Sequence, residues 1–274
     1  MKLVPGSITQ SDLVVLHQSS WAGDTLEVVD DGPLRILHFG TYLKQSCIFR
    51  ANPQRLVLPY TRHMLALLAY HAQPRRVLMV GLGGGTMARF LLEHFPACEM
   101  DVVEIIPHMV GIARRFFGLP LSSRLRHHVD DGAQFLNTLA TQTPPPCFDL
   151  LLIDAYNAVG MAKTVYAETF FRHCHTLLGP DGVMAVNLSR SKAEAYARAM
   201  AAIDAIFPGS TRQFRPAGSN NVILFAAPRP EQLGLTKVTR WMATRDTRME
   251  LALTDLLTMP RMQQFPWWKY IIDF

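Results

Sequence analysis

The sequence contains few cysteines and no long apolar run, and each absence excludes a class of protein. Only four of its 274 residues are cysteine, and no two of them form a C-x-x-C pair. This argues against a disulfide framework and against a structural zinc site, so we expect no metal. No run approaches the ~20 apolar residues of a membrane-spanning helix. The first residues, Met1 to Gly6, lack the apolar core of a secretory signal. We therefore expect a cytoplasmic protein with no membrane partner.

Charged residues are also scarce. They make up 18% of the chain, and 27 Lys and Arg against 22 Asp and Glu give a net charge of only +5. So small an excess over this length does not indicate nucleic acid, and we expect no nucleic-acid partner. Hydrophobic residues make up 49%, which is enough for a globular core and excludes a disordered chain.

The first 59 residues predict a small β module. Strands are expected at Leu26–Val29 and Leu34–Phe39, joined by a turn over Asp30–Pro33, and a third extended run covers Tyr42–Phe49. So few strands do not form a stable unit alone. We therefore expect the module to pack on, or pair with, another part of the chain.

Residues 60–230 alternate between short apolar runs and helical patterns, which predicts a second, larger domain. After a helix over 64–70, strands are expected at 77–80, 100–104, 125–129, 148–153 and 183–188, with helices at 87–95, 107–117, 133–140, 164–178 and 193–207. An antiparallel pair, 211–215 and 221–226, closes the series. This order predicts an α/β fold with a doubly wound, Rossmann-like, mostly parallel seven-stranded sheet. Residues 231–274 predict a helical tail whose aromatic end, Phe265–Trp268, serves either structure or an interface.

A glycine-rich turn follows the first expected parallel strand and opens a helix. Its glycines are Gly81, Gly83, Gly84 and Gly85, and they allow a ligand to approach the backbone N–H groups closely. Glu104 ends the next strand, 19 residues after Gly85, where an acid holds ribose hydroxyls in Rossmann-like sheets. These two signals also fit a dinucleotide enzyme, although the third glycine of its fingerprint falls on a threonine.

Two further acids follow parallel strands. Asp131 comes after the strand 125–129, and Asp154 ends the strand 148–153. The carboxyl ends of parallel strands line one crevice, so Glu104, Asp131 and Asp154 are predicted to face a single cleft. In that cleft Asp131 can accept a hydrogen bond from an adenine amino group, and Asp154 lies nearer the reacting centre.

At these residues the stretch Val77–Leu188 resembles the class I AdoMet-binding fold and, more narrowly, the spermidine synthase (polyamine aminopropyltransferase) family. The stretch Leu43–Ser46 is similar to that family's Gly-x-x-x-Gln-Ser sequence, and Tyr60 to its motif tyrosine. The resemblance covers residues 25–227 and implies that residues 60–230 form an AdoMet-type, nucleoside-binding catalytic domain. It implies a homodimer, a cytoplasmic location and a role in polyamine biosynthesis.

The resemblance also implies roles for individual residues. Glu104 would bind the ribose and Asp131 the adenine of the nucleoside, and Gln45 would lie near the donor. Asp154 matches the catalytic aspartate that begins the family's Asp-Ser-Ser-Asp motif, and Tyr60 would stand beside the acceptor amine.

Two positions depart from the family pattern. The acid of the family's Gly-Gly-Gly-Asp-Gly turn, which contacts the donor's aminopropyl ammonium, falls on Gly84, and the polyamine-binding second acid of Asp-Ser-Ser-Asp falls on Asn157. Two charge-assisted hydrogen bonds to ammonium groups, worth about 1.5–3 kcal/mol each, are thereby lost. The glycine turn is also similar to spermidine-synthase-like methyltransferase domains that modify a translation elongation factor, and free glycine N–H groups would accept the carboxylate of AdoMet.

The sequence therefore predicts a transferase with AdoMet or decarboxylated AdoMet as co-substrate. The reaction is an in-line displacement beside a sulfonium, in which Asp154 takes the amine proton, helped by Tyr60 or Tyr156. The expected acceptor of aminopropyl transfer is a small amine or polyamine, with Asn157 as a substrate-binding residue. Methyl transfer, to a small or protein amine, is the alternative. A second alternative is an inactive nucleoside-binding or scaffold protein.

Overall fold

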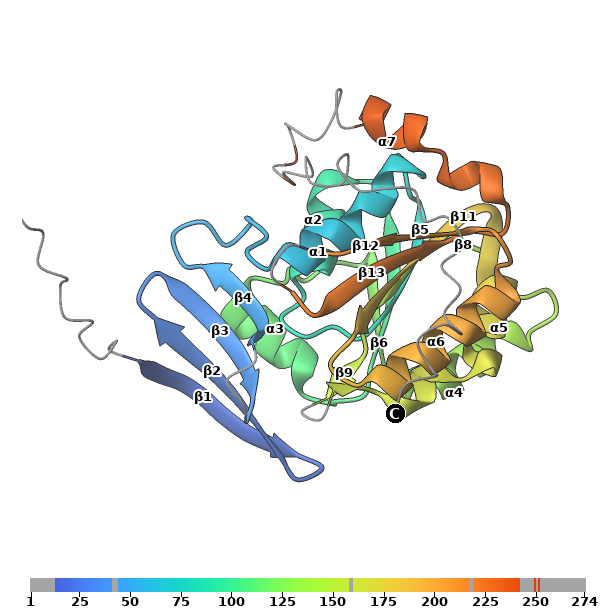
Figure 1. Cartoon of the computed structure of the whole chain (residues 1–274). Helices are drawn as coiled ribbons and strands as arrows, with labels where there is room; N and C mark the ends of the chain where they lie inside the picture. Colours follow the sequence, from blue (N-terminus) through green and yellow to red (C-terminus); the bar gives the residue numbers. More distant parts are fainter. Residues whose placement is uncertain are drawn as a thin grey trace, which may run out of the picture.

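A computed structural model describes residues 13–40, 44–157, 160–216, 219–241, 249 and 251. Figure 1 shows a large central sheet with helices on both sides and a separate small sheet, drawn in blue, beside this body. The predicted α/β class, with its mostly parallel seven-stranded sheet and N-terminal β module, is confirmed. The aromatic segment Phe265–Trp268 lies outside the described residues.

The small sheet is antiparallel and has the strand order β1-β2-β3-β4. Its strands are β1 (Val14–Trp21), β2 (Asp24–Asp31), β3 (Leu34–Phe39) and β4 (Lys44–Phe49). The last three were expected from the sequence, but β1 was not. A register shift between Val15 and His17 interrupts the alternation of β1, and much of the strand is exposed, so its sequence carries little strand signal.

This sheet packs on the larger body, as expected for so few strands. Arg35 donates to the carbonyl oxygen of Phe116 at 3.2 Å, and the Ser19 hydroxyl lies 3.1 Å from the ring nitrogen Nε2 of His108. From β4, the Ser46 hydroxyl accepts a hydrogen bond from the N–H of Gly84 at 2.7 Å. The small sheet is therefore tied directly to the glycine-rich turn.

The large sheet has the strand order β12-β13-β11-β8-β5-β6-β7. Its central pairs are parallel, and β13 runs antiparallel to both β11 and β12. In chain order the strands are β5 (Arg76–Val80), β6 (Glu99–Glu104), β7 (Leu125–Val129), β8 (Phe148–Ile153), β11 (Leu178–Ser189), β12 (Thr211–Phe214) and β13 (Asn221–Ala226). A further antiparallel pair of short strands, β9 (Tyr156–Asn157) and β10 (Gly160–Met161), follows β8.

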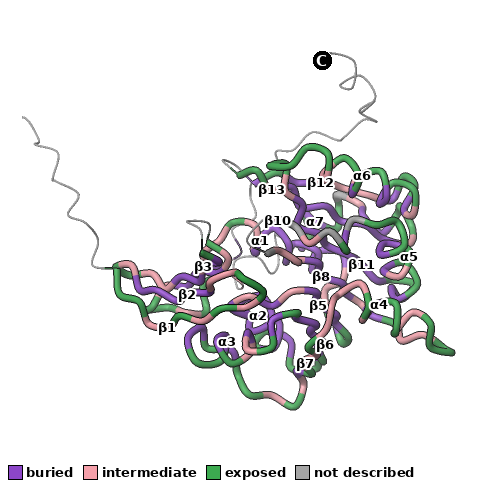
Figure 2. The backbone as a smooth tube through the Cα atoms, turned by 90° about the horizontal axis from the view of Figure 1, so that it is seen from below, coloured by how far each residue is buried: buried purple, intermediate pink, exposed green. Residues whose placement is uncertain are grey.

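Both faces of the large sheet are buried, which explains the uninterrupted apolar runs of its strands. In β5, Val77 and Met79 pack into one hydrophobic cluster, whereas Leu78 and Val80 pack into another on the opposite face. Figure 2 shows this burial as purple strands at the centre of the body. The helices of the first cluster are α1 (Pro59–Leu65), α2 (Thr86–His94), α3 (Met109–Phe117) and α7 (Leu235–Trp241); those of the second are α4 (Gly132–Ala140), α5 (Glu168–Leu177) and α6 (Ala193–Ile206).

Three expected helices differ in detail. The helix expected over 64–70 is α1 followed by a 3-10 helix, η1 (Ala66–Ala69). The helix expected over 164–178 is split into the 3-10 helix η2 (Lys163–Tyr166) and α5, since Ala167 between them is extended. The helix expected over 107–117 is α3, which begins only at Met109. Pro107 therefore precedes the helix rather than occupying its first turn. A further 3-10 helix, η3 (Pro230–Leu233), precedes α7. No helix among the described residues is long and apolar enough to cross a membrane.

Gly81 fixes the ends of three neighbouring strands. Its N–H donates to the carbonyl oxygen of Val103 at 2.9 Å, and the N–H of Asp154 donates to that of Val80 at 2.9 Å. Gly81 has a φ of +88°, and a Cβ built on it would lie only 2.2 Å from the backbone oxygen of Asp154. No residue with a side chain fits there unless the end of β8 moves.

We predict that Gly81→Ala lowers the free energy of unfolding by at least ~2 kcal/mol, because the new methyl group meets backbone atoms and the φ value is left-handed. Gly111→Ala is the matched control. A Cβ built on Gly111 in α3 has no neighbour within 4 Å, so alanine should stabilise the helix by ~0.5–1 kcal/mol. Urea denaturation measures both. Equal stability of Gly81→Ala and the wild type would show that the close approach of Gly81 to the Asp154 backbone does not constrain the fold.

Candidate active site

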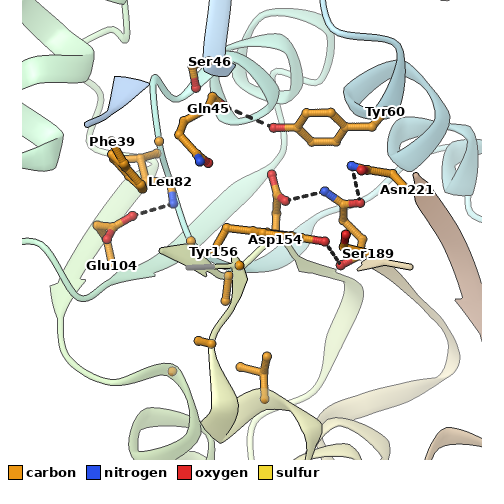
Figure 3. A pocket seen from close by; sticks show the side chains of 18 of the residues that line it. Phe39, Gln45, Ser46, Tyr60, Leu82, Glu104, Asp154, Tyr156, Ser189 and Asn221 are labelled. Carbon is orange, nitrogen blue, oxygen red and sulfur yellow. Dashed lines mark hydrogen bonds between the residues drawn. The ribbon is translucent and has the colours of Figure 1, made fainter. Parts of the chain in front are cut away.

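One cavity of about 490 Å³ opens at the carboxyl ends of the parallel strands. Its size is typical of sites that enclose a small organic molecule. Residues following β5, β6, β7, β8 and β11 line it, together with β3, β4 and α1. Figure 3 shows Glu104 and Leu82 on one side of this space, Asn221 and Ser189 on the other, and Asp154 between them.

Glu104 is held rigidly at the end of β6. Only 7% of the residue is exposed. One carboxylate oxygen accepts the N–H of Leu82 at 2.8 Å and the other accepts the N–H of Ile106 at 3.0 Å. Burial raises the pKa of this carboxyl, and the backbone hydrogen bonds oppose the rise. Each oxygen keeps lone pairs that can accept further hydrogen bonds from a ligand.

Asp131 lines the same cavity and also caps α4. Its Oδ1 accepts the N–H groups of Ala133 at 2.9 Å and Gln134 at 3.2 Å, which is an ordinary N-cap arrangement. Its Oδ2 accepts the hydroxyl of Thr164, another lining residue, at 3.2 Å. The helix-capping function and exposure to the cavity therefore coexist in one carboxylate.

Asp154 accepts the last hydrogen bond in a series that runs through two side-chain amides. Its Oδ1 accepts a hydrogen bond from Asn187 Nδ2 at 2.9 Å, and Asn187 Oδ1 accepts one from Asn221 Nδ2 at 2.9 Å. Burial raises the pKa of Asp154 to about 6, against the lowering effects of Asn187 and Tyr60, and the charge of Glu104 adds to the rise. Asp154 is therefore a much stronger base than an ordinary carboxylate and is still mostly ionised at neutral pH.

Two tyrosines and a glutamine adjoin this aspartate. The Tyr60 hydroxyl, carried by α1, donates to the carbonyl oxygen of Gln45 at 3.3 Å. Burial first, and then the charge of Asp154, raise the pKa of Tyr60 well above its usual value, so the phenol keeps its proton. The Tyr156 hydroxyl donates to the carbonyl oxygen of Asn187 at 3.1 Å. Figure 3 shows Gln45 and Tyr60 reaching the cavity from the opposite side to Tyr156.

The structure thus brings Gln45, Tyr60, Glu104, Asp131, Asp154 and Tyr156 to one cavity. For Asn157 it gives the backbone, in β9, whereas the side chain lies outside what is described. Among the described residues, no group of three or more His, Cys, Asp or Glu side chains is placed to hold a metal ion.

The glycine turn contributes only in part. Gly81 and Gly83 line the cavity, but Gly84 and Gly85 are not among its described lining residues. The N–H of Gly84 already donates to Ser46, so it is not free to bind a ligand carboxylate. A Cβ at position 84 would lie 2.8 Å from the Cβ of Ser46 and 3.0 Å from the ring of Phe117. Any side chain at position 84 therefore requires Ser46 or Phe117 to shift.

Sequence reasoning missed several lining residues. Ile105 is 44% exposed and lines the cavity beside Glu104, where it offers an apolar surface to a flat ring. Asn187 is 4% exposed and lies within an otherwise apolar strand run. A buried amide must be hydrogen-bonded, so an asparagine at the end of a predicted buried strand was a signal that could have been used.

Known proteins resemble this chain in both fold and sequence. The chain is 30% identical to a polyamine aminopropyltransferase of Chromobacterium violaceum over 82% of its own length and 83% of that protein. It is 32% identical to the human eEF1A lysine and N-terminal methyltransferase over 58% of its length, which is 24% of that protein. It also resembles the structure of human methyltransferase-like protein 13 in complex with SAH, with 25% identity and a TM-score of 0.62 over 79% of this chain and 100% of the other.

These relatives are aminopropyltransferases and methyltransferases, so the chain is an enzyme of one of these two types. The family model described as "Spermine/spermidine synthase domain" matches residues 59–203, from the start of α1 through most of α6. That segment contains the glycine turn and the three acids of the cavity. The chain belongs to the spermine/spermidine synthase family.

Proposed function

We propose that the protein transfers an alkyl group from an adenosyl sulfonium donor to an amine, with aminopropyl transfer from decarboxylated AdoMet as its principal reaction. The observation that carries the proposal is Asp154. A carboxylate with a pKa of about 6 lies in the same cavity as Glu104 and Asp131, where a nucleoside would be bound. A buried base of raised pKa within a cleft is characteristic of catalytic sites.

The lining residues are suited to the nucleoside part of the donor. Glu104 has free lone pairs for ribose hydroxyls, and the exposed Ile105 provides a surface for the adenine ring. Asp131 can accept from the adenine amino group while it caps α4. The complex of the human methyltransferase-like protein with SAH supports a donor of this class.

The reaction forms one N–C bond and breaks one C–S bond. The lone pair of the neutral amine attacks the carbon next to the sulfonium, and the electrons of the C–S bond stay on sulfur, which leaves as a neutral thioether. An alkyl ammonium has a pKa of about 10.4, so one proton must be removed overall. Asp154 receives that proton and passes it to solvent, while Tyr60 and Tyr156 orient the amine.

The relatives and the cavity favour different transferred groups. The aminopropyltransferase of Chromobacterium matches most of both chains, which favours aminopropyl transfer. Methyl transfer from AdoMet is the second candidate, because Gly84 carries no acid to hold an aminopropyl ammonium and the packing of Ser46 and Phe117 leaves no space for one.

Product analysis decides between the two. The purified protein would be incubated with either donor and a panel of primary amines, and the nucleoside product identified by chromatography. We expect methylthioadenosine to form from decarboxylated AdoMet. Release of S-adenosylhomocysteine from AdoMet alone would favour methyl transfer. Formation of neither product would contradict the proposal.

We predict that Asp154→Asn lowers turnover by at least ~100-fold while nucleoside binding stays within a few fold of the wild type. The amide is similar in shape and can still accept the hydrogen bond from Asn187, but it cannot take a proton. Steady-state kinetics and calorimetry with methylthioadenosine test this prediction. Unchanged turnover would remove Asp154 from the catalytic role.

We also predict a pH dependence with a defined sign. Because the ionised form of Asp154 is the base, kcat/KM should fall as pH drops below about 6. The hydrogen bond from Asn187 lowers this pKa, so Asn187→Ala should raise it and move the acidic limb to higher pH. Asn137→Ala, on the exposed face of α4, should leave the limb in place. An acidic limb that is the same in all three proteins would contradict this assignment.

A further inference from the structure

The side of the cavity beyond Asp154 has a composition that the family resemblance does not explain. It is formed by the loop between β11 and α6 and the loop between β12 and β13, which lie together because the N–H of Arg190 donates to the carbonyl oxygen of Asn220 at 3.0 Å. The lining residues from these loops and from the strand ends beside them are Ser189, Ser191, Lys192, Ser219, Asn220 and Asn221. We call this surface the acceptor wall.

The described part of the acceptor wall contains no carboxylate. The acids among the described lining residues are Glu104, Asp131 and Asp154, and the first two lie on the nucleoside side. Asp154 is thus the one described acid available to an acceptor, and it is needed for the amine that reacts.

The charge that the acceptor wall does carry is positive. Lys192 lines the cavity, and a Cβ built on Gly160, another lining residue, would lie 4.0 Å from its Nζ. No described carboxylate forms an ion pair with Lys192. The nearest acid along the chain, Glu194, is exposed and pairs with Arg198. Lys44, also a lining residue, adds a second positive charge to the cavity.

These charges determine which acceptors can bind well. The second ammonium of a diamine would meet a lysine and neutral hydroxyl and amide groups, so it would lose hydration without gaining a counter-charge. A carboxylate at the same place would gain a charge-assisted hydrogen bond from Lys192 and further hydrogen bonds from serine and asparagine side chains. Such a contact is equivalent to at least ~10-fold in affinity.

From this arrangement we infer that the acceptor is a small amine that carries a carboxylate at its far end, held by Lys192 and the polar side chains of the acceptor wall. The inference rests on the proposed function, since it names the acceptor class for the same cavity. It assigns the reacting amine to Asp154 and the anionic end of the same molecule to Lys192.

A matched pair of acceptors tests the inference. Putrescine and γ-aminobutyrate have similar chain lengths, but one ends in an ammonium and the other in a carboxylate. Binding of each would be measured by calorimetry on the protein saturated with methylthioadenosine, and alkylation by mass spectrometry with both donors. We expect γ-aminobutyrate to bind at least ~10-fold more tightly than putrescine.

Three variants test whether Lys192 causes the preference for γ-aminobutyrate over putrescine. Lys192→Glu should reverse it, chiefly through KM, and Lys192→Met, which keeps the aliphatic stem, should abolish it without reversal. Lys237→Glu, on the exposed surface of α7 and outside the cavity, changes the net charge equally and should leave the preference intact. Tighter binding of putrescine by the wild type, binding of neither amine, or an unchanged preference in Lys192→Glu would each overturn the inference. Preferential binding of γ-aminobutyrate without any alkylated product would instead overturn the proposed function.

Discussion

The close approach of the Gly81 backbone to that of Asp154 is the constraint on which the site depends. With no Cβ at Gly81, the ends of β5 and β8 come together, so the glycine-rich turn and the proposed base share one edge of the sheet. Everything else in the cavity is arranged around that edge. Glu104 is fixed by the N–H groups of Leu82 and Ile106, and Asp154 by the amide of Asn187.

The cavity is shared between two units that are far apart in the sequence. β4 supplies Gln45 and Ser46, and the large sheet supplies the acids. The hydrogen bond between Gly84 and Ser46 joins these units at the glycine turn itself. The small antiparallel sheet therefore forms a wall of the site, which explains why so few strands, unable to fold alone, are useful to the protein.

The sequence allowed the central fold and three acids to be predicted because their signals are local. Strands buried on both faces give continuous apolar runs, and an acid at the end of such a run, as with Glu104, is easily recognised. By contrast, β1 is half exposed and irregular. Asn187 depends on Asn221 from a strand more than thirty residues later, and Lys192 acts from a loop, so the significance of either residue depends on tertiary contacts. The N–H of Gly84 was predicted to be free, but the structure shows that Ser46 occupies it.

The packing around Gly84 limits how this enzyme can diverge. An aspartate restored at that position, as in the wider family's glycine turn, would collide with Ser46 and the ring of Phe117. Recovering the acid therefore requires coordinated replacements in β4 and at the end of α3 as well. The residue at position 84 is thus constrained jointly by three chain segments: the glycine-rich turn, β4 and the end of α3.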